Sequence, residues 1–297
     1  MSVTARFIGG TGRCGTAMLG AVFAAHPETT YFREPRFISD PGGLAEYVQG
    51  KTSLAEFKRR MGRHFWRSLV NKTRLQRELS TQDIRTVNLA REPYAGRKSS
   101  GELSIQDVYA PDEVERVMDE TMDGQDRAED GRRFLHKLFS LAGSPYWVEK
   151  TPHTVRFVDT LYKMFDGQMR YLHLIREPKD IFASFLQQRW GPKNVSGFTG
   201  WYSMIMTEAS VAFQQVPRRY CKVVEMEHLA ASPCDVLPEV FAFFEIPAEP
   251  GWIFDVSKTI SLRDAHIGRH ANEITRDAKH EIDRVCGELY AWWKEWE

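Results

Sequence analysis

The sequence of 297 residues predicts an α/β fold with a central, mostly parallel sheet that is flanked by helices. Several short apolar runs are each followed by a segment with helical periodicity, which is typical of βα units. A glycine-rich turn follows the first of these runs, where many α/β proteins bind phosphate. We therefore expect one domain over residues 1–297, with its ligands at the carboxyl ends of the strands.

The predicted strands are short and rich in apolar residues, as in a sheet covered on both faces. Helices are predicted where apolar residues recur every three or four positions, and Ser232-Pro233 looks like a helix start. The predicted strands cover residues 6–8, 29–32, 146–148, 171–175 and 221–226, and the predicted helices contain 18–23, 155–165, 181–186, 236–244 and 271–296.

Residues 50–140 contain no clear strand, and we interpret them as a helical insertion over the carboxyl edge of the sheet. The apolar pattern predicts one helix over 54–69 and another around 114–118. Between them, residues 91–104 are rich in Gly, Pro and Ser and are expected to form a loop.

Charge is unevenly distributed within this insertion. Residues 51–78 carry nine Lys or Arg against two Asp or Glu, whereas 102–130 carry eleven Asp or Glu against two Arg. Two interpretations remain open: both segments are solvated helix faces that partly neutralise each other, or one of them lines a ligand site.

The overall composition argues against nucleic acid and membranes as partners. Lys and Arg number 40, as do Asp and Glu, so the formal net charge is zero. No run approaches the roughly 18 apolar residues that cross a bilayer, and we do not interpret residues 17–25 as a signal peptide. The four cysteines lack CxxC spacing, which fits a reducing, cytoplasmic location.

The first chemical motif is the turn Gly9-Gly10-Thr11-Gly12-Arg13-Cys14-Gly15-Thr16 between a predicted strand and a predicted helix. Glycines let the backbone approach an anion, and the helix N-terminus offers free N–H groups. A kinase P-loop would read GxxxxGK[ST], but here Thr16 follows Gly15 directly and the lysine is missing. The turn therefore predicts a P-loop-like phosphate site in which Arg13 supplies the cation.

The second motif follows the predicted strand 171–175. Arg176-Glu177-Pro178-Lys179-Asp180 stands at the strand end, and Ser184 lies two turns into the next helix. Either Arg176 and Ser184 converge on a further phosphate, or Arg176 pairs with a neighbouring carboxylate and Ser184 only packs.

Together these motifs resemble the sulfotransferases that use 3′-phosphoadenosine 5′-phosphosulfate (PAPS), in particular their bacterial and carbohydrate-type branch. GTGRCGTA at 10–17 is similar to the family's 5′-phosphosulfate loop, and REPKDIFAS at 176–184 to its 3′-phosphate motif. The resemblance spans residues 5–48 and 146–297, and it implies a P-loop-like fold with the insertion over the acceptor cleft. Further similar stretches are HPE at 26–28, FREPRF at 32–37, EKTP at 149–152, VVEMEHLAASP at 223–233 and Gly268-Arg269.

The resemblance implies which residues bind the donor nucleotide. Arg176 and Ser184 would hold the 3′-phosphate, with Arg269 assisting from a loop that closes over the nucleotide. Cys14 would act through its backbone N–H, although a redox role is an alternative because a helix N-terminus lowers a thiol pKa. The residues that would hold the 5′-phosphosulfate are Gly12, Arg13, Cys14, Gly15, Thr16 and Ala17.

The resemblance also implies the catalytic residues. Glu34 would be the general base that takes the proton of the acceptor, and Lys150 and Arg13 would stabilise the leaving bisphosphate. His153 is a rival base, although it stands one residue further along than the histidine of other sulfotransferases. Alternatively, Glu34 only pairs with a neighbouring arginine and His153 is a surface histidine.

No metal ligands are expected, because the pair His266 and His270 lacks the glutamate of an HExxH motif. We expect a metal-independent transferase whose co-substrate is PAPS and whose product is 3′,5′-bisphosphoadenosine (PAP). Its acceptor would be a small-molecule, carbohydrate or lipid-linked hydroxyl or amine. The alternatives are a P-loop-type nucleotide kinase and a nucleotide-binding protein without turnover.

Overall fold

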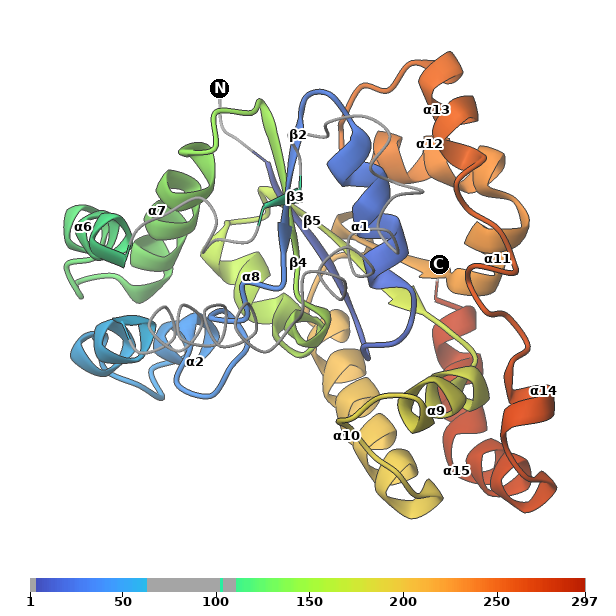
Figure 1. Ribbon diagram of the computed structural model, residues 1–297. Coiled ribbons are helices and arrows are strands. Elements are labelled where there is room, and N and C mark those ends of the chain that lie inside the picture. Colours follow the sequence, from blue (N-terminus) through green and yellow to red (C-terminus); the bar gives the residue numbers. More distant parts are fainter. Residues whose placement is uncertain (1–3, 63–101, 104–110, 297) are drawn as a thin grey trace, which may run out of the picture. The chain divides into compact units, whose positions relative to one another are not determined.

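The described part of the chain forms an α/β structure built on a mostly parallel sheet. The computed structural model describes residues 4–62, 102–103 and 111–296. Within these residues six strands have the hydrogen-bonding order β3-β2-β4-β1-β5-β6, and helices connect most of them (Figure 1). The predicted fold class is confirmed. The chain divides into two compact units, which we describe in turn.

The first unit contains the described residues among 1–5, 20–150 and 160–168. Its strands are β2 (Thr29–Arg33), β3 (Glu102–Leu103) and β4 (Tyr146–Lys150). β2 runs parallel to β3 and to β4, and the register pairs Arg33 with Lys150 where β2 and β4 end. The predicted strands at 29–32 and 146–148 are therefore present, and both continue slightly further than predicted.

The helices of this unit are α2 (Leu44–Val48), a helix over residues 54–62, α6 (Pro111–Thr121) and α7 (Arg127–Ser140). α7 buries its aromatic face against the sheet. The Phe139 ring centroid lies 4.4 Å from that of Phe32 and 4.7 Å from that of Trp147. This close aromatic packing fixes α7 against β2 and β4.

A buried carboxylate holds α2 and α7 together. Asp130 is completely buried and accepts hydrogen bonds from the Tyr47 hydroxyl at 2.5 Å and from the backbone N–H of Asp123 and Gly124. It also forms an ion pair with Arg133 at 2.9 Å. Because each of these donors would lose its acceptor if the carboxylate were removed, Asp130 is a structural anchor of the insertion.

The structure corrects the prediction that residues 50–140 lack a strand. β3 at Glu102–Leu103 extends the sheet beside β2, inside the stretch expected to be a loop. A two-residue strand is too short to show a period-two pattern, so the sequence carried no signal for it. The helix predicted over 54–69 is present at 54–62, and its remainder lies outside the described residues. The helix predicted around 114–118 is confirmed as α6.

Several acidic residues of the insertion form ion pairs in the described part of the chain. Lys58 contacts Asp119 at 2.6 Å, and Arg116 contacts Glu120 at 3.6 Å. Arg132 contacts Glu129 at 2.7 Å. Of these pairs, Lys58–Asp119 joins the basic and the acidic segment, and exposed pairs of this kind contribute little to stability.

The second unit contains the described residues among 6–19, 151–159 and 169–297. Its strands are β1 (Ala5–Gly10), which begins at the boundary, β5 (Met169–Ile175) and β6 (Cys221–Glu225). β5 and β6 are parallel and pair Tyr171 with Cys221 through Ile175 with Glu225. All three strands were predicted, and the Gly-rich turn follows β1 directly.

The helices of the second unit include a group that lies side by side: α9 (Pro178–Leu186), α10 (Val195–Gln214) and α15 (Arg276–Lys294) (Figure 1). No helix among the described residues combines the length and apolar character needed to span a bilayer. Two helices cross the boundary between the units: α1 (Thr16–Ala25) and α8 (Val158–Met164), which follows the short helix η1 (Pro152–Phe157). The remaining helical segments of the second unit are η2 (Arg218–Tyr220), α11 (Met226–Ala231), α12 (Pro233–Phe243), α13 (Pro250–Ser257) and α14 (His270–Glu273).

The predictions missed α10, which is the longest helix described. It buries Phe198, Tyr202 and Phe213 on one side, but apolar residues also stand at exposed positions such as Met204 and Val211. This blurs the 3.6-residue period on which the prediction relied. The helix at Ser232-Pro233 is confirmed as α12 with its proline in the first turn, but the Ser232 side chain makes no capping hydrogen bond.

A fully buried histidine lies in the core of the second unit. His173 on β5 packs its ring 4.5 Å from the Trp293 ring and 5.7 Å from the Phe213 ring, measured between centroids. Neither ring nitrogen has a hydrogen-bond partner among the described residues. Burial lowers the pKa of His173 to about 3, because the protonated ring would be an uncompensated charge in an apolar core.

We predict that His173 makes the fold sensitive to acid. The unfolded chain protonates this histidine below its ordinary pKa of 6.5, whereas the folded chain does not do so until about 3. The free energy of unfolding therefore falls as the pH drops through this window, by about 2 kcal/mol at pH 5 relative to pH 7.5 from His173 alone. In denaturant unfolding experiments at both pH values, the free energy of unfolding of His173→Phe should fall by about 2 kcal/mol less between pH 7.5 and pH 5 than that of the unmodified chain.

The exposed residue His280 provides the control, since His280→Gln should keep the pH dependence of the unmodified chain. A His173→Phe variant that loses as much stability between pH 7.5 and pH 5 as the unmodified chain would contradict the prediction.

Candidate functional site

The glycine-rich turn after β1 has a left-handed backbone, and two of its glycines leave no room for a side chain. Gly12 and Gly15 have φ angles of 81° and 95°, and Arg13 between them has 58°. A Cβ atom on Gly15 would lie 2.1 Å from the sulfur of Met226, and one on Gly10 would lie 2.7 Å from the Leu174 carbonyl oxygen. The glycines therefore permit both the left-handed turn and its close contact with β5 and α11.

α1 begins at Thr16, immediately after this turn, so its first N–H groups face the same region as the turn. Arg13 and Ala17 are exposed, whereas Thr11, Cys14 and Thr16 are buried and support the turn from inside. The positive end of the helix dipole and the exposed arginine together can bind an anion such as a phosphate or sulfate group.

The structure argues against the redox hypothesis for Cys14. Its side chain is completely buried, and burial raises the pKa of the thiol although hydrogen bonds to Gly12 and Thr11 act in the opposite direction. A buried thiol with a raised pKa forms little of the reactive thiolate. Cys14 is therefore available to a ligand only through its backbone.

Two hydrogen bonds join the second motif to the glycine-rich turn, a contact that the sequence did not predict. The Arg13 Nε donates a hydrogen bond to Ser184 Oγ at 2.9 Å, and Arg176 Nη1 donates to the Arg13 carbonyl oxygen at 3.2 Å. Arg176 also lies 3.6 Å from Asp180, so part of the alternative interpretation holds as well. Arg13, Arg176 and Ser184 thus form one cluster within the second unit.

Arg176 keeps one nitrogen without a partner. Its side chain is 6% exposed, and its Nε is buried with no hydrogen-bond partner among the described residues. A buried, unpaired guanidinium N–H is costly unless a ligand accepts its hydrogen bond. Together with Arg13 and the hydroxyl of Ser184, this nitrogen fits the binding of a phosphate group.

A contact between Glu177 and Glu227 joins the end of β5 to α11. Glu177 accepts a hydrogen bond from the Lys179 N–H at the start of α9, and its own N–H donates to Glu227 at 3.0 Å. Burial raises the pKa of Glu227. This residue lies in the stretch 223–233, but the sequence offered no role for it because the contact with Glu177 arises only in the folded chain.

The C-terminal loop with Arg269 is held against the same motif. Asp180 accepts hydrogen bonds from the N–H of Gly268 at 2.7 Å and from the N–H and Nδ1 of His270 at 3.0 and 2.6 Å. The guanidinium of Arg269 binds Glu273 at 2.8 Å. The sequence indicated Asp180 only as a possible partner of Arg176, argued against a metal-ligand role for His270, and offered no role for Glu273.

In the first unit, Glu34 and Lys150 form an ion pair at the ends of β2 and β4. Lys150 Nζ lies 2.6 Å from Glu34 Oε1, and the Glu34 N–H donates to the Lys150 carbonyl oxygen at 2.7 Å. The parallel register of β2 and β4 places Arg33 beside Lys150, so the residue after each strand falls at the same edge. Glu34 itself has a φ of 50°, a left-handed conformation that is uncommon for glutamate.

The two members of this pair differ in burial. The Lys150 side chain is 0% exposed, and burial lowers its pKa although Glu34 opposes the shift. The Glu34 side chain is 45% exposed; partial burial raises its pKa, but the charge and hydrogen bond of Lys150 bring it below the ordinary value. Glu34 is therefore ionised at neutral pH and has the charge that a proton acceptor needs.

His153 belongs to η1 in the second unit. Its ring centroid lies 6.4 Å from that of Trp201 on α10, with the two planes inclined by 57°. The structure thus groups Arg13, Arg176 and Ser184 in one unit and pairs Glu34 with Lys150 in the other. The contact of His153 with Trp201 is an aromatic packing contact.

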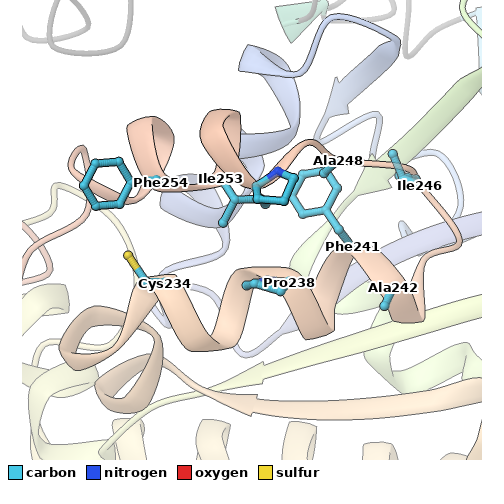
Figure 2. Close-up of a pocket in the computed structure, with 9 residues that line it drawn as sticks. Cys234, Pro238, Phe241, Ala242, Ile246, Ala248, Ile253 and Phe254 are labelled. Atoms are coloured by element: carbon cyan, nitrogen blue, oxygen red, sulfur yellow. The ribbon is translucent and has the colours of Figure 1, made fainter.

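A separate pocket of about 410 Å³ lies between α12 and α13 in the second unit (Figure 2). Phe241 on α12 and Ile253 and Phe254 on α13 contribute to its wall, and Cys234 stands at one end. Its lining has no charged side chain and none of the motif residues. The pocket therefore offers nothing to neutralise a phosphate.

The chain was compared with protein families and with solved structures. The sulfotransferase family model matches residues 6–250. The solved sulfotransferase domain from the curacin biosynthetic pathway is 14% identical, with a TM-score of 0.51 over 97% of this chain and 98% of that one. Sulfotransferase STF1 from Mycobacterium tuberculosis H37Rv is 16% identical, with a TM-score of 0.49 over 96% and 77% of the two chains.

The comparison with curated proteins finds no match. The similarity to the curacin-pathway domain supports the same fold. Because the family model matches most of the chain, from β1 to the start of α13, the chain belongs to the sulfotransferase family.

Proposed function

We propose that this sulfotransferase uses PAPS as its donor and moves the sulfuryl group to a hydroxyl or amine of an acceptor. The observation that carries the proposal is the cluster of Arg13, Arg176 and Ser184, in which the two phosphate motifs meet. Two separate phosphate motifs fit a donor with phosphate on both the 5′ and the 3′ side. The buried, unpaired Nε of Arg176 supports the second of these positions.

The donor would lie with its 5′-phosphosulfate on the turn and its 3′-phosphate on the second motif. Gly12, Arg13, Cys14, Gly15, Thr16 and Ala17 would bind the first group through backbone N–H groups and the guanidinium of Arg13. Arg176 and Ser184 would bind the 3′-phosphate, with Arg269 assisting, because charge-assisted hydrogen bonds from arginine suit phosphate oxygens.

In the proposed reaction Glu34 accepts the proton of the acceptor, whose oxygen or nitrogen forms the new bond to sulfur. The bond between sulfur and the bridging phosphate oxygen breaks, and that oxygen keeps the electron pair. Lys150 and Arg13 stabilise the negative charge that develops on the leaving bisphosphate. The ion pair of Lys150 with Glu34 supports this assignment, since it keeps the base ionised and the lysine charged. His153 is the alternative base.

The acceptor class in the proposal is a small-molecule, carbohydrate or lipid-linked hydroxyl or amine, and we propose a cytoplasmic location. The four cysteines are free in the described structure, which supports a reducing compartment. A mass-spectrometric screen of candidate acceptors with PAPS, scored for added sulfate, identifies the acceptor. A nucleotide kinase and a nucleotide-binding protein without turnover remain the rival functions, and the missing P-loop lysine disfavours the kinase.

The first prediction concerns the donor. PAP should bind at least tenfold more tightly than ADP, because PAP alone carries a 3′-phosphate for Arg176 and Ser184; tenfold corresponds to about 1.4 kcal/mol. Isothermal titration calorimetry measures both affinities. Ser184→Ala should weaken PAP and leave ADP unchanged, whereas Ser210→Ala on α10 should affect neither. Equal affinities of the unmodified chain for PAP and ADP would favour the kinase.

The second prediction concerns metal ions. Turnover of PAPS with the identified acceptor should be nearly unchanged in excess EDTA, because Arg13, Lys150 and backbone N–H groups neutralise the leaving group. Added magnesium should give no stimulation. A loss of activity that magnesium restores would contradict the proposed donor chemistry.

The third prediction identifies the general base. Glu34→Gln should lower kcat on the order of a hundred- to ten-thousandfold while leaving PAP affinity nearly intact, because the amide keeps the size of the carboxylate without its basicity. His153→Ala should cost less than tenfold. The two variants are compared in steady-state assays, and a reversal of these effects would make His153 the base.

The pH dependence of kcat/KM separates the same two bases. The pKa of Glu34 lies below its ordinary value of 4.5, so Glu34 is ready to accept a proton throughout the range above that value. kcat/KM should therefore stay level from pH 7.5 down to about 5. An activity that declines below about pH 6.5 would instead indicate an unperturbed histidine.

A further inference from the structure

The segment 265–270, which we call the strap, is fixed to the start of α9 by a single carboxylate. Asp180 is 1% exposed and accepts three hydrogen bonds from the strap: one from Gly268 and two from His270. Hydrogen bonds to a buried carboxylate are strong and costly to break, because the charge would otherwise remain unsatisfied. α14, which begins at His270, accordingly lies beside α9 (Figure 1).

The strap is also fixed by Arg176. Arg176 Nη2 donates to the carbonyl oxygens of Ala265 at 2.9 Å and of His266 at 2.8 Å, while Nη1 donates to Arg13. These contacts set the plane of the guanidinium, and Nε has no hydrogen-bond partner in the described part of the chain. The strap therefore fixes the orientation of the Arg176 side chain, and in this orientation the buried Nε is available to a ligand.

Arg269 is the only arginine of the strap itself, and its side chain is held as well. It binds Glu273 with both Nε and Nη2, at 3.0 and 2.8 Å, and is 15% exposed. The backbone on either side of Arg269 is the part that Asp180 binds. A displacement of Gly268 and His270 would therefore move Arg269.

We propose that Asp180 and His270 are positioning residues that hold the strap so that Arg269 is presented to the 3′-phosphate of the donor. The inference rests on the proposed function, which supplies the 3′-phosphate. If Arg269 is held in place before the ligand arrives, less conformational entropy is lost on binding, and the ligand therefore binds more tightly. Neither Asp180 nor His270 needs to touch the nucleotide.

The proposal differs from a purely structural role in what it predicts for ligands. A structural defect would weaken every nucleotide that uses the second unit. A displaced Arg269 would weaken only nucleotides that carry a 3′-phosphate. The ratio of the Kd of 5′-AMP to the Kd of PAP isolates that contribution, because the two probes share the adenosine and the 5′-phosphate.

His270→Ala is the main variant, because His270 contacts Asp180 and, unlike Asp180, makes no described contact with Arg176. It should lower the ratio about tenfold by weakening PAP, which is the size expected for a charge-assisted hydrogen bond. The Kd of 5′-AMP should not change. His270→Asn keeps an N–H donor near the position of Nδ1 and should restore the ratio to within about threefold of the unmodified chain. His280→Ala, on the exposed side of α15, is the control.

A double-mutant cycle with Arg269→Met tests whether His270 acts through Arg269. In the Arg269→Met background, His270→Ala should have no further effect on the ratio. Asp180→Asn should resemble His270→Ala if the variant folds, and its melting temperature reports on folding. The inference does not depend on Asp180→Asn, since His270→Ala leaves the carboxylate in place.

The outcomes distinguish an error in the proposed donor from an error in the positioning role of His270. If the unmodified chain binds PAP and 5′-AMP equally, the proposed donor is wrong, whatever the variants do. If the unmodified chain prefers PAP and His270→Ala keeps the preference, the positioning role is overturned while the donor stands. Equal weakening of both nucleotides, or additive effects of His270→Ala and Arg269→Met, would also overturn it.

Discussion

The guanidinium of Arg176 is the interaction on which the donor side of this molecule depends. It donates hydrogen bonds to the carbonyl oxygen of Arg13 and to those of the neighbouring residues Ala265 and His266, two places in the chain that are both far from Arg176 in the sequence. A lysine could not replace it, because only the planar arginine fork directs several N–H groups at once along fixed directions. The end of β5 thereby connects the turn after β1 with the C-terminal strap.

The contacts around Arg176 also stabilise the buried carboxylate of Asp180. Burial raises the pKa of Asp180, but hydrogen bonds from His270 and Gly268 and the charge of Arg176 bring it below the ordinary value. Asp180 therefore remains an anion and completes the hydrogen bonding of the strap. The nitrogen left unpaired, Nε of Arg176, is the one the proposed ligand would satisfy.

In the other unit the buried charge is a cation, the ammonium group of Lys150. A completely buried ammonium group needs a nearby anion, and Glu34 is 2.6 Å away with an unusual backbone conformation. The left-handed φ of Glu34 turns the chain directly after β2, and the carbonyl of Lys150 accepts the Glu34 N–H at this point. Strain of this kind persists only where the surrounding contacts fix the backbone, and it often occurs at functional sites.

The sequence by itself determined the parallel α/β class, five of the strands and the residues of both phosphate motifs, because these depend on local patterns. Apolar runs, glycine spacing and strand-end charges can be read without a partner. It left open whether Arg176 and Ser184 converge or whether Arg176 only pairs with a neighbouring carboxylate, and it did not predict the contacts of both residues with Arg13.

Only the tertiary structure decided the contacts between segments distant in the sequence. β3 became a strand because β2 offers it an edge, and α10 is a helix whose outward apolar residues hid its periodicity. The pairing of Glu34 with Lys150 spans 116 positions and that of Asp180 with His270 spans 90. Such pairs leave no pattern in one sequence, because hydrogen bonds and burial depend on distance in space and not on spacing along the chain.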